Sequence, residues 1–164
     1  MDTIYNNDAR RRPNSNLEQE SAMVDGIKWE YDINDGLATI KRCKSPVGAL
    51  EVPRSLGGCP VRQIGDSAFD GCANLRAVKF PRSVWHIGKN AFRDCAELET
   101  IDLTNEITRV GEGAFCGCSA LKSVYIAPGW RRIEPKTFKD CKKLTSIIFP
   151  NVYYVGEEAF AGRG

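Results

Sequence analysis

The residue types in this 164-residue chain that could do chemistry are seven cysteines and one histidine. The cysteines occupy positions 43, 59, 72, 95, 116, 118 and 141, and the histidine is His86. Nucleophilic catalysis needs a thiol beside a base, a disulfide needs two paired thiols, and a metal needs several ligands around one point. The positions of these residues in the fold therefore decide whether catalysis, disulfide formation or metal binding is possible.

Four of the cysteines share one fixed place in a repeated phrase, three residues after a phenylalanine. They are Cys72, Cys95, Cys118 and Cys141. If each phrase is one structural unit, these thiols form a column with neighbouring Cβ atoms roughly 4.8 Å or more apart. A disulfide needs Cβ atoms about 3.8 Å apart, and ligands in a line cannot surround a tetrahedral ion. We therefore expect reduced, inaccessible thiols, with no metal and no cofactor.

Catalysis is not indicated by the remaining residues. His86 follows Trp85 and is expected to point outward beside a strand, away from the inner column of cysteines. The sequence has no glycine-rich phosphate loop and none of the patterns H-E-x-x-H, C-x-x-C and G-x-S-x-G. Carboxylates are scattered singly, so no acid–base pair can be named. These observations predict a protein without enzymatic activity.

The elements that position these residues belong to an internal repeat. Phenylalanine recurs at 69, 92, 115, 138 and 160, at spacings of 23, 23, 23 and 22 residues. The phrase around it reads Ile-Gly-Asp-Ser-Ala-Phe-Asp-Gly-Cys at 64–72 and Ile-Gly-Lys-Asn-Ala-Phe-Arg-Asp-Cys at 87–95. A fixed period in the low twenties indicates a solenoid, in which each repeat is one coil stacked on the last.

Each coil repeats one inward set of apolar residues. The coil 98–118 begins with the pattern L-x-x-I-x-L, which predicts a short strand with one buried face. Ile107 and Val110 follow as a return segment, and Gly111 is expected to turn the chain at positive φ. Trp130 falls in the inward return column of the next coil and is therefore predicted to be core.

These columns resemble the BspA-type leucine-rich repeat, L-x-x-I-x-I-P-x-x-V-x-x-I-G-x-x-A-F-x-x-C, over about residues 49–162. The resemblance implies an α/β-type repeat solenoid, a short right-handed stack of coils built mostly of short parallel strands and turns, with an N-terminal β-hairpin cap. Four positions depart from the pattern. Glu134 replaces the glycine, Thr137 replaces the alanine, and Thr104 and Ala127 replace the proline.

The expected organisation has three segments: a disordered polar lead-in at 1–22, an N-terminal β cap at 23–58, and BspA-type repeats at 59–164, the last one incomplete. A net charge of +2 gives no reason to expect a nucleic-acid partner. No apolar stretch is long enough to span a membrane, and the lead-in lacks the apolar core of a secretory signal. The localisation stays open, because the family resemblance implies cell-surface or secreted proteins. Either the chain is intracellular, or it is a piece of an exported protein.

The feature most suited to function is a pair of outward columns beside the return segments, where aromatic residues alternate with arginine. Such residues are enriched at interface hot spots. The candidate partner-binding residues are Trp85, Arg109, Arg131, Arg132, Tyr153 and Tyr154. The alternative is that they are ordinary solvated residues whose stems pack between coils. The resemblance implies a non-enzymatic module that binds a protein or glycan.

A second function class is a structural or self-associating unit. The last complete strand is expected at 144–149, where Ile147, Ile148 and Phe149 follow one another. An unpaired apolar edge is a template for association. We therefore expect weak self-association through the C-terminal end, unless the segment 152–160 already covers it.

Overall fold

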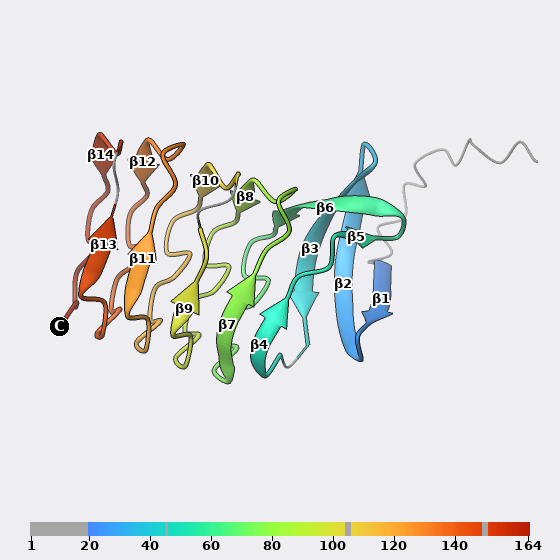
Figure 1. The fold of residues 1–164 in the computed structure, drawn as a ribbon, viewed down its shortest axis with the longest axis horizontal. Coiled ribbons are helices and arrows are strands. Elements are labelled where there is room, and N and C mark those ends of the chain that lie inside the picture. Colours follow the sequence, from blue (N-terminus) through green and yellow to red (C-terminus); the bar gives the residue numbers. More distant parts are fainter. Residues whose placement is uncertain (1–19, 45, 104–105, 149–150) are drawn as a thin grey trace, which may run out of the picture.

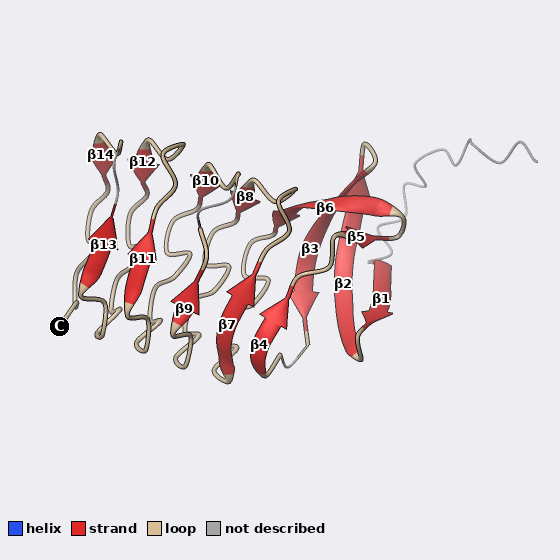
Figure 2. Ribbon diagram, viewed as in Figure 1, coloured by secondary structure: helices blue, strands red, loops and turns tan. Residues whose placement is uncertain are grey.

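The computed structural model describes residues 20–44, 46–103, 106–148 and 151–164, and these consist of strands and turns. Figure 2 shows strands and loops throughout this part of the chain, without a helix. The expectation of an α/β-type solenoid is therefore wrong, and the fold is a β-solenoid of stacked coils. The reason lies in the turn after each return strand, where residues such as Ser67 and Gly71 adopt positive φ and so interrupt any helical run.

The strands in chain order are β1 (Glu20–Val24), β2 (Ile27–Asn34), β3 (Leu37–Cys43), β4 (Gly48–Glu51), β5 (Ser55–Leu56), β6 (Cys59–Ile64), β7 (Leu75–Lys79), β8 (His86–Ile87), β9 (Thr100–Ile101), β10 (Arg109–Val110), β11 (Ser123–Tyr125), β12 (Arg132–Ile133), β13 (Ser146–Ile148) and β14 (Tyr154–Val155). Figure 1 shows β7, β9, β11 and β13 along one edge of the stack and β8, β10, β12 and β14 along another.

One side of the stack, which we call the front sheet, is formed by the first strand of each coil. Strands β4, β7 and β9 pair in parallel, and so do β11 and β13. A single bridge between Leu103 and Ile126 joins the two groups. The register aligns Val78 with Ile101, as the apolar columns predict. The expected strand 144–149 is observed as β13, while Phe149 lies outside the described residues.

The second side of the stack, which we call the return sheet, contains β3, β6, β8 and β10, which pair in parallel. Strands β12 and β14 also pair in parallel, but they form a separate two-stranded sheet. The return sheet is therefore split between β10 and β12.

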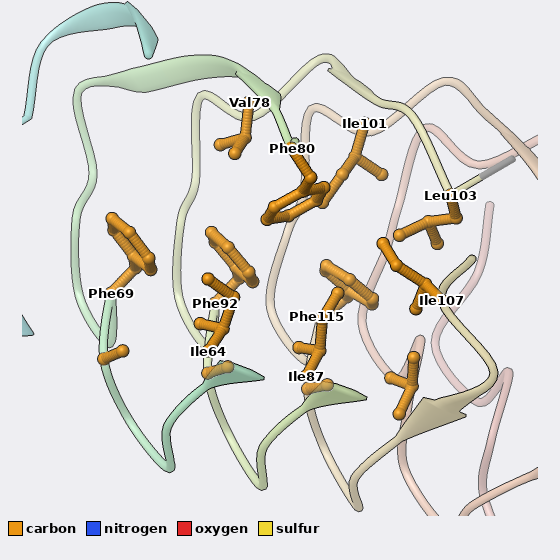
Figure 3. Close-up of a cluster of buried hydrophobic side chains, with 14 of the residues drawn as sticks. Ile64, Phe69, Val78, Phe80, Ile87, Phe92, Ile101, Leu103, Ile107 and Phe115 are labelled. Carbon is orange, nitrogen blue, oxygen red and sulfur yellow. The ribbon is translucent and has the colours of Figure 1, made fainter. Parts of the chain in front are cut away.

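The third side, which we call the far wall, consists of the turns that carry the repeated phenylalanines. The rings of Phe69 and Phe92 stack with centroids 4.8 Å apart, and Phe92 and Phe115 follow at 5.6 Å. The stack continues through Phe138 to Phe160. Figure 3 shows the first three rings side by side, facing the core residues of the two sheets. Trp130 is 1% exposed, which confirms its predicted place in the core.

The glycine column behaves differently from the expectation. Gly111 does not have positive φ among the described residues; the positive φ lies two residues later, at Gly113 and its equivalents. A Cβ built on Gly111 would lie 2.6 Å from the backbone nitrogen of Lys89 in the preceding coil. Glycine is therefore needed here because two backbones approach closely, and the prediction of a positive-φ turn is wrong.

The N-terminal strands β1, β2 and β3 form an antiparallel meander, and β3 then continues into the return sheet through β6. Trp29 is buried and meets the ring of Phe69 edge-on, with centroids 6.2 Å apart. Strand β1 begins at Glu20, inside the segment expected as a polar lead-in, and residues 1–19 lie outside the described part. The capping role of the meander and the right-handed coil remain predictions.

Candidate functional site

The six candidate residues lie on the outer surface of the return strands. Arg109, Arg132 and Tyr154 begin β10, β12 and β14. Trp85, Arg131 and Tyr153 directly precede β8, β12 and β14. Parallel pairing places Arg132 opposite Tyr154. Five of the six side chains are exposed, with Tyr153 at 74%, while Trp85 is half-buried. The structure thus brings the predicted residues onto one outward surface, which crosses the split.

The arginines of this surface have unequal surroundings. The guanidinium of Arg132 lies 4.0 Å from the ring centroid of Tyr154, and its Nε lies 3.3 Å from a carboxylate oxygen of Glu134. Arg109 and Arg131 form no ion pair or side-chain hydrogen bond within the described part of the chain. Two cationic groups therefore remain without a carboxylate partner on a surface that already holds aromatic rings.

His86 shares this surface but does not add to its charge. Its Nδ1 lies 3.2 Å from the side-chain oxygen of Gln63, one coil earlier. Burial, followed by the positive charge of Arg109, lowers the pKa of His86, and Asp66 only partly opposes this. The imidazole is therefore neutral at pH 7 and available as a hydrogen-bonding group.

A cleft of about 350 Å³ opens on the return side, at the split between β10 and β12. It is lined by His86, Thr108, Arg109, Val110, Gly111, Gly129, Arg131, Arg132 and Glu134. Three of the six predicted residues, all arginines, line it, while Trp85, Tyr153 and Tyr154 do not. The cleft was not predicted from the sequence.

Backbone hydrogen bonds show how the cleft forms. At other steps of the return sheet two such bonds join successive coils, for example from Thr108 N–H to the Trp85 carbonyl (3.0 Å) and from Gly111 N–H to the Ile87 carbonyl (2.9 Å). Between the described residues of β10 and β12, neither equivalent bond is present: Arg131 N–H does not reach the Thr108 carbonyl, nor does Glu134 N–H reach that of Val110.

Two departures from the repeat explain the missing bonds. Glu134 occupies the glycine column, where a Cβ would collide with the preceding backbone at the neighbouring positions. Trp130 stands in a column otherwise filled by valine and isoleucine, and its indole N–H donates to the carbonyl of Ile107 at 2.6 Å. Both side chains hold the two coils apart on the return side. The substitution Glu134 was visible in the sequence, and it was the signal that could have found the cleft.

The column cysteines lie apart from this surface, in the far wall. All seven cysteines of the chain are free, and Cys95, Cys118 and Cys141 are buried as predicted. Each of these three thiols donates to a phenylalanine carbonyl of the previous coil at 3.2 Å. Burial raises the pKa of Cys95 and Cys141 to about 12, which disfavours the thiolate.

Cys72 differs from the other column members because it is only half-buried. It lines a separate recess beside Cys43, at the coil nearest the N-terminal meander. The prediction that all four column thiols are inaccessible is therefore wrong for this one, since no preceding phenylalanine coil covers it.

The described residues contain no group of three histidine, cysteine or acidic side chains placed to hold a metal ion. A helix both long and apolar enough to cross a membrane is likewise not found among them.

Comparison with known families gives one clear match. The family described as BspA type leucine rich repeat region matches residues 55–163 in six copies. No curated protein matches the chain.

Several solved structures share the fold. A leucine-rich cell surface protein from Faecalibacterium prausnitzii has 24% identity and a TM-score of 0.65, and the match covers 88% of this chain and 46% of that protein. A leucine-rich repeat protein from Bacteroides capillosus has 26% identity and a TM-score of 0.58 over 82% of this chain and 97% of that one. The pneumococcal vaccine antigen PcpA has 15% identity and a TM-score of 0.64, covering 88% of this chain and 42% of that one. The chain thus spans less than half the length of two of these proteins.

Proposed function

Because the chain belongs to the BspA-type leucine-rich repeat family, we propose that it is a binding module without enzymatic activity of its own. Its binding surface is the outer face of the return strands, carrying Trp85, Arg109, Arg131, Arg132, Tyr153 and Tyr154. The partner is a protein or a glycan.

The observation that supports this proposal most directly is the combination of exposed rings with arginines that lack carboxylate partners. Two other surface arginines are paired across coils, Arg93 with Asp70 at 2.6 Å and Arg76 with Glu97 at 3.1 Å. Arg109 and Arg131 are not neutralised in this way by any described residue. Aromatic and guanidinium groups supply contact area and directed hydrogen bonds at low entropic cost, which is why they dominate interface energetics.

The solved relatives support a location outside the cell. The protein from Faecalibacterium prausnitzii is a cell surface protein, and PcpA is a vaccine antigen. Because this chain spans less than half the length of either, we propose that it acts as the binding segment of a surface-exposed protein.

The proposal is tested by capturing partners with the immobilised chain and measuring the affinity of each for two matched variants. In Trp85→Ala/Arg132→Ala the face loses one ring and one guanidinium. The control, Tyr125→Ala/Arg82→Ala, likewise removes one aromatic ring and one guanidinium, from exposed positions outside the face. We expect the first variant to bind at least about tenfold more weakly and the control to bind normally, with similar melting temperatures for all three proteins. Equal affinity for wild type and the first variant would remove this face as the binding surface.

A second candidate function, self-association, is favoured by one observation at the terminal coil. Val155 is 49% exposed, although its equivalents Val110 and Ile133 in the same inward column are 8% and 0% exposed. We propose that a second copy of the chain covers Val155, because an exposed apolar strand edge is a template for association. Sedimentation at about 100 μM should then show a dimer that Val155→Lys abolishes. A monomeric wild type at that concentration, or an unchanged dimer in the variant, would contradict this.

A further inference from the structure

We infer that the cleft between β10 and β12 binds the carboxylate or sulfate group of an acidic sugar. This inference rests on the proposed function, because it places one ligand class at one point of the proposed face. The cleft holds about 350 Å³, which falls at the lower end of the range of small-ligand sites.

The cleft is built by specific residues, Glu134 and Trp130. Continuous pairing at this step would close it, as it does between β6 and β8 and between β8 and β10. Glu134 and Trp130 prevent that pairing, and they leave the backbone N–H groups of Arg131 and Glu134 without backbone acceptors in the described chain. Unpaired donors at the edge of a site are suited to an anionic ligand, which offers only acceptors.

The lining of the cleft carries more positive than negative groups. Three guanidinium groups and one carboxylate line the cleft. Arg132 is already shared between Glu134 and the Tyr154 ring, but Arg109 and Arg131 are not engaged by described residues. Planar guanidinium groups bind carboxylate, sulfate and phosphate oxygens in a fork, with stronger hydrogen bonds than neutral donors provide. The cleft is therefore set up for an anion.

The aromatic side chains beside the cleft suit the remainder of a sugar ligand. Trp85 precedes β8, one coil before Arg109, and Tyr153 and Tyr154 lie one coil after the arginines of β12. Rings therefore stand on both sides of the cationic cleft. Aromatic side chains present flat apolar faces with a polar tip, and a sugar ring has a matching apolar face and polar rim. Thr108 and the neutral His86 add hydroxyl and imidazole groups that can meet sugar hydroxyls. An acidic peptide satisfies the charge but uses these flanking groups less well.

The ligand class is tested by calorimetric titration of the chain with four probes of similar length. These are a sulfated uronic-acid oligosaccharide, the same oligosaccharide without sulfate, a neutral glucan and polyglutamate. We expect one or both acidic sugars to bind and the neutral glucan to fail. Preference between the first two probes assigns the anion as sulfate or carboxylate. Polyglutamate binding as tightly as the acidic sugars, or no binding of any acidic sugar at low salt, would overturn the inference.

The position is tested with charge variants. Arg109→Gln/Arg131→Gln should weaken binding of the acidic sugar by about tenfold or more, because two charge-assisted contacts are lost. Arg62→Gln/Arg82→Gln removes the same charge from exposed arginines outside the cleft. If the two variants weaken binding equally, the attraction is a general charge effect and the cleft is not the site.

The cleft itself is tested at Glu134, where geometry and charge predict opposite outcomes. Glu134→Gln removes a negative charge and keeps the side chain that holds the coils apart, so affinity should rise a few-fold. Glu134→Gly removes the same charge but lets the coils close, so affinity should fall and the amides of residues 131 and 134 should become protected from hydrogen exchange. If these amides stay exposed in Glu134→Gly because of Trp130, the double variant Trp130→Val/Glu134→Gly serves as the closing variant. It restores the usual residue types of the return column and the glycine column.

These outcomes separate the inference from the proposed function. A closing variant that binds acidic sugar as well as the wild type contradicts the cleft site, even where captured partners still depend on Trp85 and Arg132. Suppose instead that the closing variant loses sugar binding, while captured partners bind Trp85→Ala/Arg132→Ala as tightly as the wild type. The cleft is then supported as the sugar site, and the broader face is rejected as the binding surface.

Discussion

The far wall and the return sheet of this solenoid carry the same repeat, but only the far wall is regular throughout. Its phenylalanine rings stack from coil to coil, and its backbone bonds continue across the step where the return sheet is split, as in the 2.9 Å bond from Phe115 N–H to the Thr137 carbonyl. The coils are thus held together on one side and separated on the other.

The difference shows which side of the repeat tolerates a change of residue type. The far-wall positions are small or flat and tightly packed, so that Thr137, which replaces an alanine there, is fully buried and bonds its hydroxyl to the Glu134 carbonyl at 2.7 Å. On the return side, Glu134 changes the spacing of two coils without disturbing the ring stack. Structure therefore depends on the uniform side, and a binding surface can arise on the side that varies.

The largest expected effect on stability comes from a substitution in the phenylalanine stack of the far wall. Phe115 is fully buried between two stacked rings. Phe115→Ala should lower the free energy of unfolding by about 3–5 kcal/mol, as deletion of a core ring does. Chemical denaturation measures this, and a loss below about 1 kcal/mol would show that the far wall is not the main source of stability.

A second split can be introduced deliberately between β8 and β10. In Gly111→Ala, the new Cβ meets the Lys89 backbone nitrogen at 2.6 Å, so the coils must separate as they do at Glu134. We expect a loss of about 1–3 kcal/mol and faster hydrogen exchange at the amide of residue 111. Lys136→Ala, at an exposed position of the next coil, is the control for an alanine substitution that does not press on the preceding coil. It should leave the amide of residue 111 protected. Unchanged exchange in Gly111→Ala would contradict the role of glycine as the spacing residue.

The buried thiols predict an alkaline weakness of the far wall. Burial raises the pKa of Cys95 and Cys141 to about 12 in the folded chain, against 9.0 for an ordinary thiol. The folded state therefore holds these protons more tightly, and the resulting stability is complete below pH 9 and is lost as the pH rises toward 12. At pH 10 the loss should be on the order of 1 kcal/mol per thiol. Cys95→Ala/Cys141→Ala should flatten the decline between pH 8 and pH 10; an equal slope in both proteins would reject the assignment.

The same thiols give a labelling test. At neutral pH, Cys95, Cys118 and Cys141 should resist alkylation in the native state and react only in denaturant. Cys72, Cys59 and Cys116 are half-buried and should react more readily. Rapid native labelling of all four column cysteines would contradict the packing of the far wall.

The smallest expected effect on stability is on the varied side. Arg131 and Tyr153 are exposed, and Arg131 is without an ion-pair partner among the described residues. Arg131→Ala/Tyr153→Ala should change the free energy of unfolding by no more than about 0.5 kcal/mol. Thermal melting checks this. A loss comparable to that of Phe115→Ala would mean that the proposed binding face is structural.

Sequence analysis recovered the columns because each coil must bury the same apolar set against its neighbours. It placed Phe92, Phe115 and Trp130 in the core correctly, and it grouped Arg132 with Tyr154 on one outward surface. It assigned helical character that the turns do not allow, and it misjudged Gly111, because close approach between coils is a property of the stack and not of the local sequence. The departure at Glu134 marks the place of the cleft in the sequence, but its effect depends on the close approach of the preceding coil, which the repeat pattern does not express.

The spacing of the coils has a further consequence for the position of the proposed binding site along the chain. The opening is set by two positions of one coil, those occupied by Trp130 and Glu134. Exchanging the residues at 107 and 111 with those at 130 and 134 should move the opening one coil toward the N-terminus, beside a different set of outward side chains. A repeat protein of this kind can therefore acquire a new specificity by relocating a gap within an unchanged scaffold.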